Sequence, residues 1–379
     1  MRVVICPDKF AGTLSAPRAA AVIAEGWSQV APGDELTCKP LADGGPGFLD
    51  VIAAAVDTVR IPVRTTDPLG RPVPGYVLRA GDTGYVESAQ ACGLHLLDTA
   101  ERDPKRTTSY GLGLLIAAAV EAGARRVVIG LGGSATNDGG AGMLAALDAA
   151  PLDDSGLALP YGGAALVACR GLGGPPQLRQ VQLVAATDVD NPLLGIHGAS
   201  AVFGPQKGAD RNDVQLLDQA LERFAEVLQR DCGDAPPDLA NLPGAGAAGG
   251  IGAALYALGG TRESGIELVT RLSGLERSLD GADLVITGEG SFDFQSLRGK
   301  VVAGVAGLSL AHGVPCVVLA GQVSVGRREL AAAGIAGAYG VADHLGGVAE
   351  ALRRPEEGLR SLAGRVARQW SPKIVQKEQ

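Results

Sequence analysis

Aromatic residues are scarce in this chain of 379 residues, at 4% of the sequence, whereas hydrophobic residues as a group make up 46%. A core of this composition has to be built mainly from alanine, valine, leucine and isoleucine. So much apolar material excludes a disordered chain and favours a compact folded protein. The length is sufficient for two domains, because one domain usually takes about 100–200 residues.

Clusters of positive charge and long apolar runs are also missing. The net charge is −8 at pH 7, and lysine and arginine occur in nothing longer than a pair. Binding to nucleic acid requires a basic surface, so nucleic acid is not an expected partner. The most apolar stretch, residues 301–321, is interrupted by His312, Gly313 and Pro315. It therefore predicts a helix followed by a strand, and no membrane span is expected.

The 6 cysteines and 4 histidines are scattered along the chain, and no pair of cysteines has the CxxC spacing. This pattern argues against both a disulfide framework and a zinc site. We expect the cysteines to be small buried side chains in a reducing compartment. The first residues predict a strand rather than a signal peptide, so the expected location is the cytoplasm.

Glycine, in contrast, is abundant, with 56 residues, and it is concentrated in one informative stretch, residues 130–140. This stretch follows a predicted strand at 126–129 and precedes a predicted helix at 143–147. A strand, a glycine-rich turn and a helix form a typical phosphate site, because backbone N–H groups and the helix N-terminus both favour an anion. An ordinary turn, with Asn137 or Asp138 capping the helix, is the alternative. The candidate nucleotide-binding residues are Gly132, Gly133, Ser134, Thr136, Asn137 and Asp138.

Carboxylates also follow four other predicted strands. Ligands bind beyond the carboxyl ends of parallel strands, so these carboxylates converge on one crevice if all the strands share a sheet. Carboxylates at such a position bind Mg²⁺ or accept a proton from a substrate hydroxyl. Helix capping is the alternative for any one of them. The strand ends carry Asp8 with Lys9, Asp43, Asp188 with Asn191, and Glu289.

The alternation of strands and helices predicts an α/β protein with a Rossmann-like, doubly wound parallel sheet. Prolines at 62, 68, 72 and 74 separate short runs that predict hairpins, and hence an inserted second domain. We expect the Rossmann-like domain to comprise residues 1–60, 100–190 and 279–379. The smaller, mixed α/β domain is expected at residues 61–99 and 191–278.

Residues 130–135 also match the GxGxxA variant of the dinucleotide-binding fingerprint. That fingerprint requires an acidic residue at the end of a second strand about 20 positions later. Asp153 and Asp154 instead lie in a loop rich in proline and glycine. A nicotinamide-dependent enzyme is therefore disfavoured.

Nine motifs, in order along nearly the whole chain, resemble those of the class I glycerate 2-kinase family. The resemblance implies ATP- and Mg²⁺-dependent phosphorylation of D-glycerate to 2-phosphoglycerate, by an α/β protein with a Rossmann-like domain and a smaller domain. The motifs are residues 7–8, 41–45, 67–73, 107–111, 130–142, 187–193, 203–209, 243–250 and 286–290.

The resemblance also suggests roles for single residues. Ser134, Thr136, Asn137 and Asp138 would bind the nucleotide phosphates and the metal. Asp188 would be the base or metal ligand that prepares the glycerate hydroxyl, with Asn191 beside it. Lys207 would neutralise the charge of the transferred phosphoryl group. A guanidinium binds a carboxylate bidentately, so Arg71 would hold the glycerate carboxylate. The remaining candidate substrate-binding residues are Asp8, Lys9, Asp43, Glu289 and Asp293.

Four positions depart from the family pattern. The family usually has lysine where Ala11 stands, glutamate at Pro46, arginine at Ser291 and a Thr-Gly-Glu sequence at residues 112–114, which end in Leu114. These departures leave two alternatives open. The chain would be a kinase of another small hydroxy acid, or a divergent member that binds nucleotide or ligand with little turnover. A homodimer is also left open.

Overall fold

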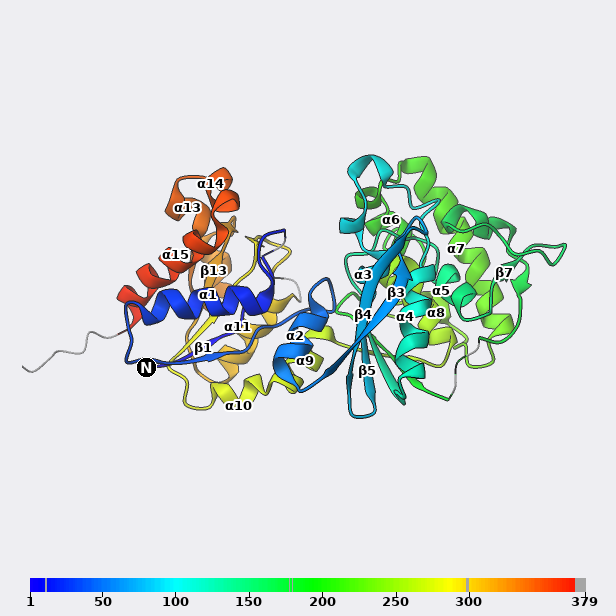
Figure 1. Cartoon of the computed structure of the whole chain (residues 1–379). Helices are drawn as coiled ribbons and strands as arrows, with labels where there is room; N and C mark the ends of the chain where they lie inside the picture. Colours follow the sequence, from blue (N-terminus) through cyan, green and yellow to red (C-terminus); the bar gives the residue numbers. More distant parts are fainter. Residues whose placement is uncertain (11, 177, 179, 298–299, 372–379) are drawn as a thin grey trace, which may run out of the picture. The chain divides into compact units, whose positions relative to one another are not determined.

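The computed structural model describes residues 1–10, 12–176, 178, 180–297 and 300–371 (Figure 1). The chain divides into two compact units. Unit 1 comprises Met1–Ala42, Asp50–Val56 and Ile266–Gln379, and unit 2 comprises Asp43–Leu49 and Asp57–Gly265. In the part of the chain that is described, no helix has the length and apolar character needed to cross a membrane.

Unit 1 is built on a five-stranded sheet in which all neighbouring strands are parallel, in the order β15-β13-β11-β1-β2. The central strands are short, continuous apolar runs because helices cover both faces of a parallel sheet. The strands are β1 (Arg2–Ile5), β2 (Glu35–Cys38), β11 (Leu284–Thr287), β13 (Cys316–Ala320) and β15 (Ile335–Gly340).

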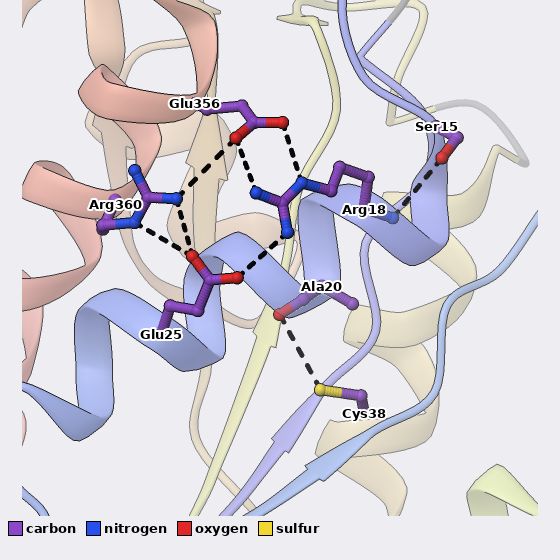
Figure 2. A network of polar contacts seen from close by, with 7 residues as sticks. All are labelled: Ser15, Arg18, Ala20, Glu25, Cys38, Glu356 and Arg360. Atoms are coloured by element: carbon purple, nitrogen blue, oxygen red, sulfur yellow. Dashed lines mark hydrogen bonds and ion pairs between the residues drawn. The ribbon is translucent and has the colours of Figure 1, made fainter.

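Helix α1 (Ala16–Ser28) connects β1 to β2, and its side chains show why the sequence forms a helix here. Ser15 caps its N-terminus by accepting a hydrogen bond from the N–H of Arg18, and the apolar face buries Trp27 completely. Helix α15 (Pro355–Trp370) packs against α1. Figure 2 shows the ion pairs that join them: Arg18 and Glu25 of α1 face Glu356 and Arg360 of α15.

Unit 2 is built on a six-stranded mixed sheet in the order β10-β9-β6-β5-β4-β3. Strands β5, β6, β9 and β10 are mutually parallel, and β4 is antiparallel to both β5 and β3. Strand β3 therefore runs in the same direction as β5, and five of the six strands end at the same edge of the sheet. The strands are β3 (Val59–Thr66), β4 (Pro72–Ala80), β5 (Thr83–Glu87), β6 (Arg126–Gly130), β9 (Gln182–Ala186) and β10 (Thr261–Glu263).

The remaining elements are mostly helices, which cover the two sheets. In unit 2 the long amphipathic helix α7 (Arg211–Asp231) buries Leu217, Leu221 and Phe224 in the core. The other helices are α2 (Phe48–Ala55), α3 (Ala89–Cys92), α4 (Tyr110–Glu121), α5 (Ala141–Ala146), α6 (Ala199–Phe203), α8 (Ala247–Ala257), α9 (Gly265–Ser273), α10 (Leu275–Leu279), α11 (Val301–Ala311), α12 (Arg327–Ala332), α13 (Val341–Leu345) and α14 (Val348–Arg353). The two-residue strands are β7 (Pro151–Leu152), β8 (Gly171–Leu172), β12 (Ser291–Phe292) and β14 (Gln322–Val323).

The expected α/β class with parallel sheets is confirmed. The two units, however, have bounds different from the predicted domains, because residues 100–190 cluster with residues 57–99. The physical reason is strand pairing: β6 forms hydrogen bonds with β5, matching Ile129 with Val86, and β9 continues the same sheet. The condition set for convergence of the strand-end carboxylates, one shared sheet, is therefore not met. Asp8 and Glu289 follow strands of one sheet, whereas Asp138 and Asp188 follow strands of the other.

Candidate functional site

The carboxyl edge of the unit 2 sheet holds the glycine-rich loop that follows β6. Its glycines are packed closely against residues 43–47. A Cβ atom on Gly132 would lie 2.6 Å from Gly45 Cα, and one on Gly133, which has a φ of +65°, would lie 2.8 Å from Pro46 Cγ. Close packing is thus sufficient to require glycine at both positions. The predicted contact of these two glycines with a nucleotide stays a prediction.

Lys207 lies in direct contact with this loop. It ends a short 3₁₀ turn after α6, and its side chain is only 2% exposed. Its Nζ donates hydrogen bonds to Ser134 Oγ at 3.0 Å and to the carbonyl oxygen of Thr136 at 2.6 Å. Burial lowers the pKa of Lys207 to about 8, although the charge of Asp138 opposes that shift. The structure therefore brings Lys207 to two other predicted residues, Ser134 and Thr136, which precede it by 73 and 71 positions.

The carboxylate of Asp138 is fully buried and accepts four hydrogen bonds. Oδ2 accepts from the N–H and the hydroxyl of Ser109, both at 2.8 Å, and from the N–H of Gly142 at 3.1 Å. Oδ1 accepts from the N–H of Gly140 at 3.2 Å. Burial is the largest cause that raises the pKa of Asp138, and these hydrogen bonds oppose the rise. The arrangement favours a role in holding the loop to the starts of α4 and α5 over the predicted metal ligation.

Asp138→Asn is expected to lower the free energy of unfolding by about 1–3 kcal/mol. The Nδ2 group of an asparagine donates and cannot accept, so the hydrogen bonds to one of the two carboxylate oxygens are lost. Urea denaturation measures the change. The control is Asp154→Asn, an exposed aspartate of the same unit, which should change the free energy by less than about 0.5 kcal/mol. Equal stability of the two variants would contradict the holding role.

Asp188 follows β9 at the same edge and is half-buried. Its Oδ1 accepts a hydrogen bond from the hydroxyl of Ser264, which follows the neighbouring strand β10, at 2.5 Å. Asp43 also lies at this edge: its Oδ1 accepts from the N–H of Gly45, and a Cβ atom on Gly265 would lie 2.6 Å from its backbone. Two of the predicted carboxylates, Asp43 and Asp188, therefore lie at the same edge as the glycine-rich loop.

Two other predicted residues of unit 2 are engaged in structural contacts. Asn191 Nδ2 donates to the carbonyl oxygen of His197 at 2.9 Å, which closes the loop after β9. Arg71 lies in the turn between β3 and β4, where its guanidinium contacts Asp67 and Glu101. The hydrogen bond from Arg71 lowers the pKa of Glu101. A substrate carboxylate would have to compete with both acidic side chains for this guanidinium.

The other predicted residues lie in unit 1. The N–H of Asp8 donates to the carbonyl oxygen of Gly288, so the ends of β1 and β11 are joined, and Lys9 Nζ lies 3.8 Å from Asp8 Oδ1. Glu289 follows β11 at this edge and is half-buried. Asp293 Oδ1 accepts from the N–H groups of two residues that follow it, which is the bonding of a local turn. Within the described residues, no group of three or more His, Cys, Asp or Glu side chains is placed to hold a metal ion.

Comparison with known proteins identifies the family. The model of the Glycerate kinase family matches residues 3–371. The chain belongs to the glycerate kinase family. It is 41% identical over 373 residues to the glycerate 2-kinase of Escherichia coli K12, with 97% of each chain covered. It is 43% identical over 330 residues to the glycerate kinase of Bacillus subtilis, with 86% of each covered.

A solved structure agrees with this assignment. A protein of Salmonella typhimurium LT2, provisionally named glycerate kinase 2, is 40% identical and superimposes with a TM-score of 0.80, covering 97% of this chain and 98% of that one. The predicted family is therefore confirmed. At the level of the family, kinase activity and a small-molecule substrate are confirmed as well.

Three of the departures from the family pattern can be placed. Pro46 packs on Gly133, Leu114 is half-buried in α4, and Ser291 is exposed at the start of β12. Ala11 lies outside the described residues. None of these three residues is among the hydrogen-bond partners of Lys207 or Asp138 given above.

Sequence reasoning missed a strained turn beside the glycine-rich loop. Ala248, Gly249 and Gly250 have φ values of 51°, 71° and 93°, and the N–H of Gly139 donates to the carbonyl oxygen of Gly249. A Cβ atom on Gly249 would lie 1.9 Å from the carbonyl oxygen of Thr136. Such backbone costs free energy and is common at functional sites. The run of glycine and alanine at residues 244–250 is the feature of the sequence that could have indicated this turn.

Proposed function

We propose that this member of the glycerate kinase family transfers the γ-phosphoryl group of ATP to the 2-hydroxyl group of D-glycerate and releases ADP and 2-phosphoglycerate. The observation that supports the proposal most is the buried ammonium group of Lys207, bonded to Ser134 and Thr136 of the loop after β6. A fixed positive charge beside a glycine-rich loop is an arrangement that can stabilise a transferring phosphoryl group.

Of two buried, unpaired polar atoms in the same loop, the hydroxyl of Thr136 is the one that suits a phosphate group. Thr136 Oγ1 and Asn137 Oδ1 are buried and have no hydrogen-bond partner among the described residues. Such atoms are rare in folded proteins, and a ligand or an ordered water accounts for them. The Thr136 hydroxyl can donate to a phosphate oxygen. Lys207 and Ser134 complete a group of donors for the phosphate chain.

Asp188 is the residue of this edge that suits the acceptor hydroxyl. The hydrogen bond from Ser264 fixes its Oδ1, and its half-buried position leaves it in contact with solvent. In the proposed reaction the hydroxyl oxygen bonds to the γ-phosphorus, the bond to the β–γ bridging oxygen breaks, and Asp188 accepts the hydroxyl proton. Mg²⁺ in kinases is usually held by one or two carboxylates together with substrate phosphates, and it supplies charge neutralisation, so Asp188 would also fit as its ligand.

A kinase of another small hydroxy acid is the second candidate. The observation in its favour is the engagement of Arg71 by Asp67 and Glu101, because the predicted site for the glycerate carboxylate is then not preformed. Cytoplasmic location and a homodimer stay predictions.

The test is a coupled ADP-release assay on the full chain with Mg-ATP and a panel of hydroxy acids that includes both enantiomers of glycerate. We expect the highest kcat/KM with D-glycerate, a ³¹P spectrum of 2-phosphoglycerate, and loss of turnover when EDTA removes the metal. A higher kcat/KM with another acid would favour the second candidate. No ADP release with any acid, together with a melting temperature raised by Mg-ATP, would instead favour a ligand-binding member with little turnover.

A further inference from the structure

Arg102 carries a buried polar atom that nothing in the described part of the chain explains. The residue is half-buried, and its Nε has no hydrogen-bond partner among the described residues. Its neighbour Glu101 is engaged by Arg71, with 2.7 Å between Oε1 and Nη1. Its other neighbour, Asp103, lies 3.8 Å from Lys105 Nζ. A cation that is partly withdrawn from water costs free energy unless an anion accompanies it, so Arg102 is suited to an anion brought by a ligand.

Arg102 belongs to a segment that is fixed to the glycine-rich loop after β6 at two points. Before Arg102, the N–H of Leu94 donates to the carbonyl oxygen of Gly133 at 2.8 Å. After it, the hydroxyl of Thr107 donates to the carbonyl oxygen of Ala135 at 2.9 Å. The segment between these two hydrogen bonds therefore lies against the loop that is proposed to bind the nucleotide phosphates.

The same segment also meets the turn that holds Lys207. Gly208, which follows Lys207, has a φ of +100°, and a Cβ atom on it would lie 3.3 Å from Arg102 Cβ. Lys207 itself donates to Ser134 and to Thr136 of the loop. All of these residues belong to unit 2. Arg102 thus adds a second cationic residue beside the turn that supplies the buried ammonium group.

The fork of N–H donors on a guanidinium matches the two oxygens of a carboxylate or of a phosphate. In the proposed reaction the nucleotide brings the phosphates, for which Lys207 and the hydroxyls of its loop are the proposed donors. The hydroxy acid brings a carboxylate, and the cation suggested for it, Arg71, is engaged by two carboxylates of the chain. The acceptor carboxylate is therefore the anion that still requires a cation in unit 2.

We propose that Arg102 binds the carboxylate of the hydroxy acid that accepts the phosphoryl group. Its half-buried side chain is partly open to solvent, as a group that receives a ligand has to be. Such a contact selects hydroxy acids over uncharged alcohols, because an alcohol leaves the guanidinium unpaired. The inference rests on the proposed phosphorylation of a hydroxy acid, and it gives Arg102 the role that the sequence suggested for Arg71.

The experiment compares Arg102 with Arg106, an exposed arginine of the same segment, in the full chain. Arg102→Gln should raise KM for the hydroxy acid at least about tenfold, because a charge-assisted pair is lost, and should leave KM for ATP within about twofold. Arg106→Gln should leave both KM values within about twofold. Arg102→Lys keeps the charge but loses the fork, so its KM for the acid should be intermediate. It is also the second variant in case Arg102→Gln does not fold.

The outcomes separate this inference from the proposed function. Equal KM values for the acid in the Arg102 and Arg106 variants would leave the kinase function standing and overturn the carboxylate site. A raised KM for ATP in Arg102→Gln would also overturn it, since that result indicates a phosphate contact or a distorted loop.

If the unchanged chain transfers no phosphoryl group to any acid, the proposed function fails, and calorimetry with D-glycerate as the probe replaces the kinetics. A Kd at least about tenfold higher for Arg102→Gln than for Arg106→Gln would then support the carboxylate site. Equal Kd values in the two variants, or no binding of D-glycerate to the unchanged chain, would overturn it.

Discussion

Asp188→Asn is expected to lower kcat by about 10³-fold, the size of loss that follows removal of a positioned proton acceptor. The residue follows β9 and is half-buried, and Ser264 from the neighbouring strand end donates to its Oδ1. An asparagine keeps the shape and can still accept this hydrogen bond, so the melting temperature should change by no more than a few degrees. The ADP-release assay measures the loss of turnover.

The control is Asp190→Asn, an exposed residue in the same loop, which should retain kcat within about twofold. A Mg²⁺ titration of the Asp188 variant distinguishes the two roles left open. Partial recovery at high Mg²⁺ indicates a lost metal ligand, whereas no recovery indicates a lost base. Turnover of Asp188→Asn at the rate of the unchanged enzyme would remove Asp188 from the mechanism.

Lys207→Met is expected to lower kcat by about 10²–10³-fold, as when one positioned electrostatic group is removed from an active site. The ammonium group holds Ser134 Oγ at 3.0 Å and the carbonyl oxygen of Thr136 at 2.6 Å, so the loop loses both an anchor and a positive charge. Two effects on stability oppose each other. A buried charge no longer has to be desolvated, but two acceptors lose their donor. We therefore expect the free energy of unfolding to change by less than about 2 kcal/mol.

The control is Lys105→Met, because Lys105 is partly exposed and forms an ion pair with Asp213 in the same unit. This variant should keep kcat within about twofold.

The pH profile gives a second readout of the role of Lys207. The pKa of Lys207 is lowered to about 8, so its charge is present below that pH and is lost as the pH rises through it. In the unchanged enzyme kcat/KM should therefore fall above about pH 8. A profile that stays flat to pH 9 would contradict the need for this charge.

The local sequence was sufficient to predict where these strands lie and which polar residues follow them. The runs before Asp138, Asp188 and Glu289 are short and mostly apolar, and they form β6, β9 and β11. Such runs favour buried parallel strands, and polar residues that follow them lie at the carboxyl edge. The same motifs identified the family, because they retain their order along the chain.

Local sequence could not show which role each polar side chain takes. Asp138 and Asp188 both follow a strand, but one is fully buried under four donors and the other is half-buried beside Ser264. Arg71 is similar: nothing in its turn indicates that Glu101 engages the guanidinium. Burial and bonding depend on residues contributed by other elements, so they are properties of the packed chain.

The sequence by itself determined the α/β class, the strand ends that carry carboxylates and the glycerate kinase family. Only the tertiary structure decided that the strands form two sheets and that Lys207 contacts Ser134, 73 positions away. It also decided that Ser264 contacts Asp188, 76 positions away. The reason is that hydrophobic periodicity specifies which segments become strands, whereas the partner and register of each strand depend on packing between distant segments.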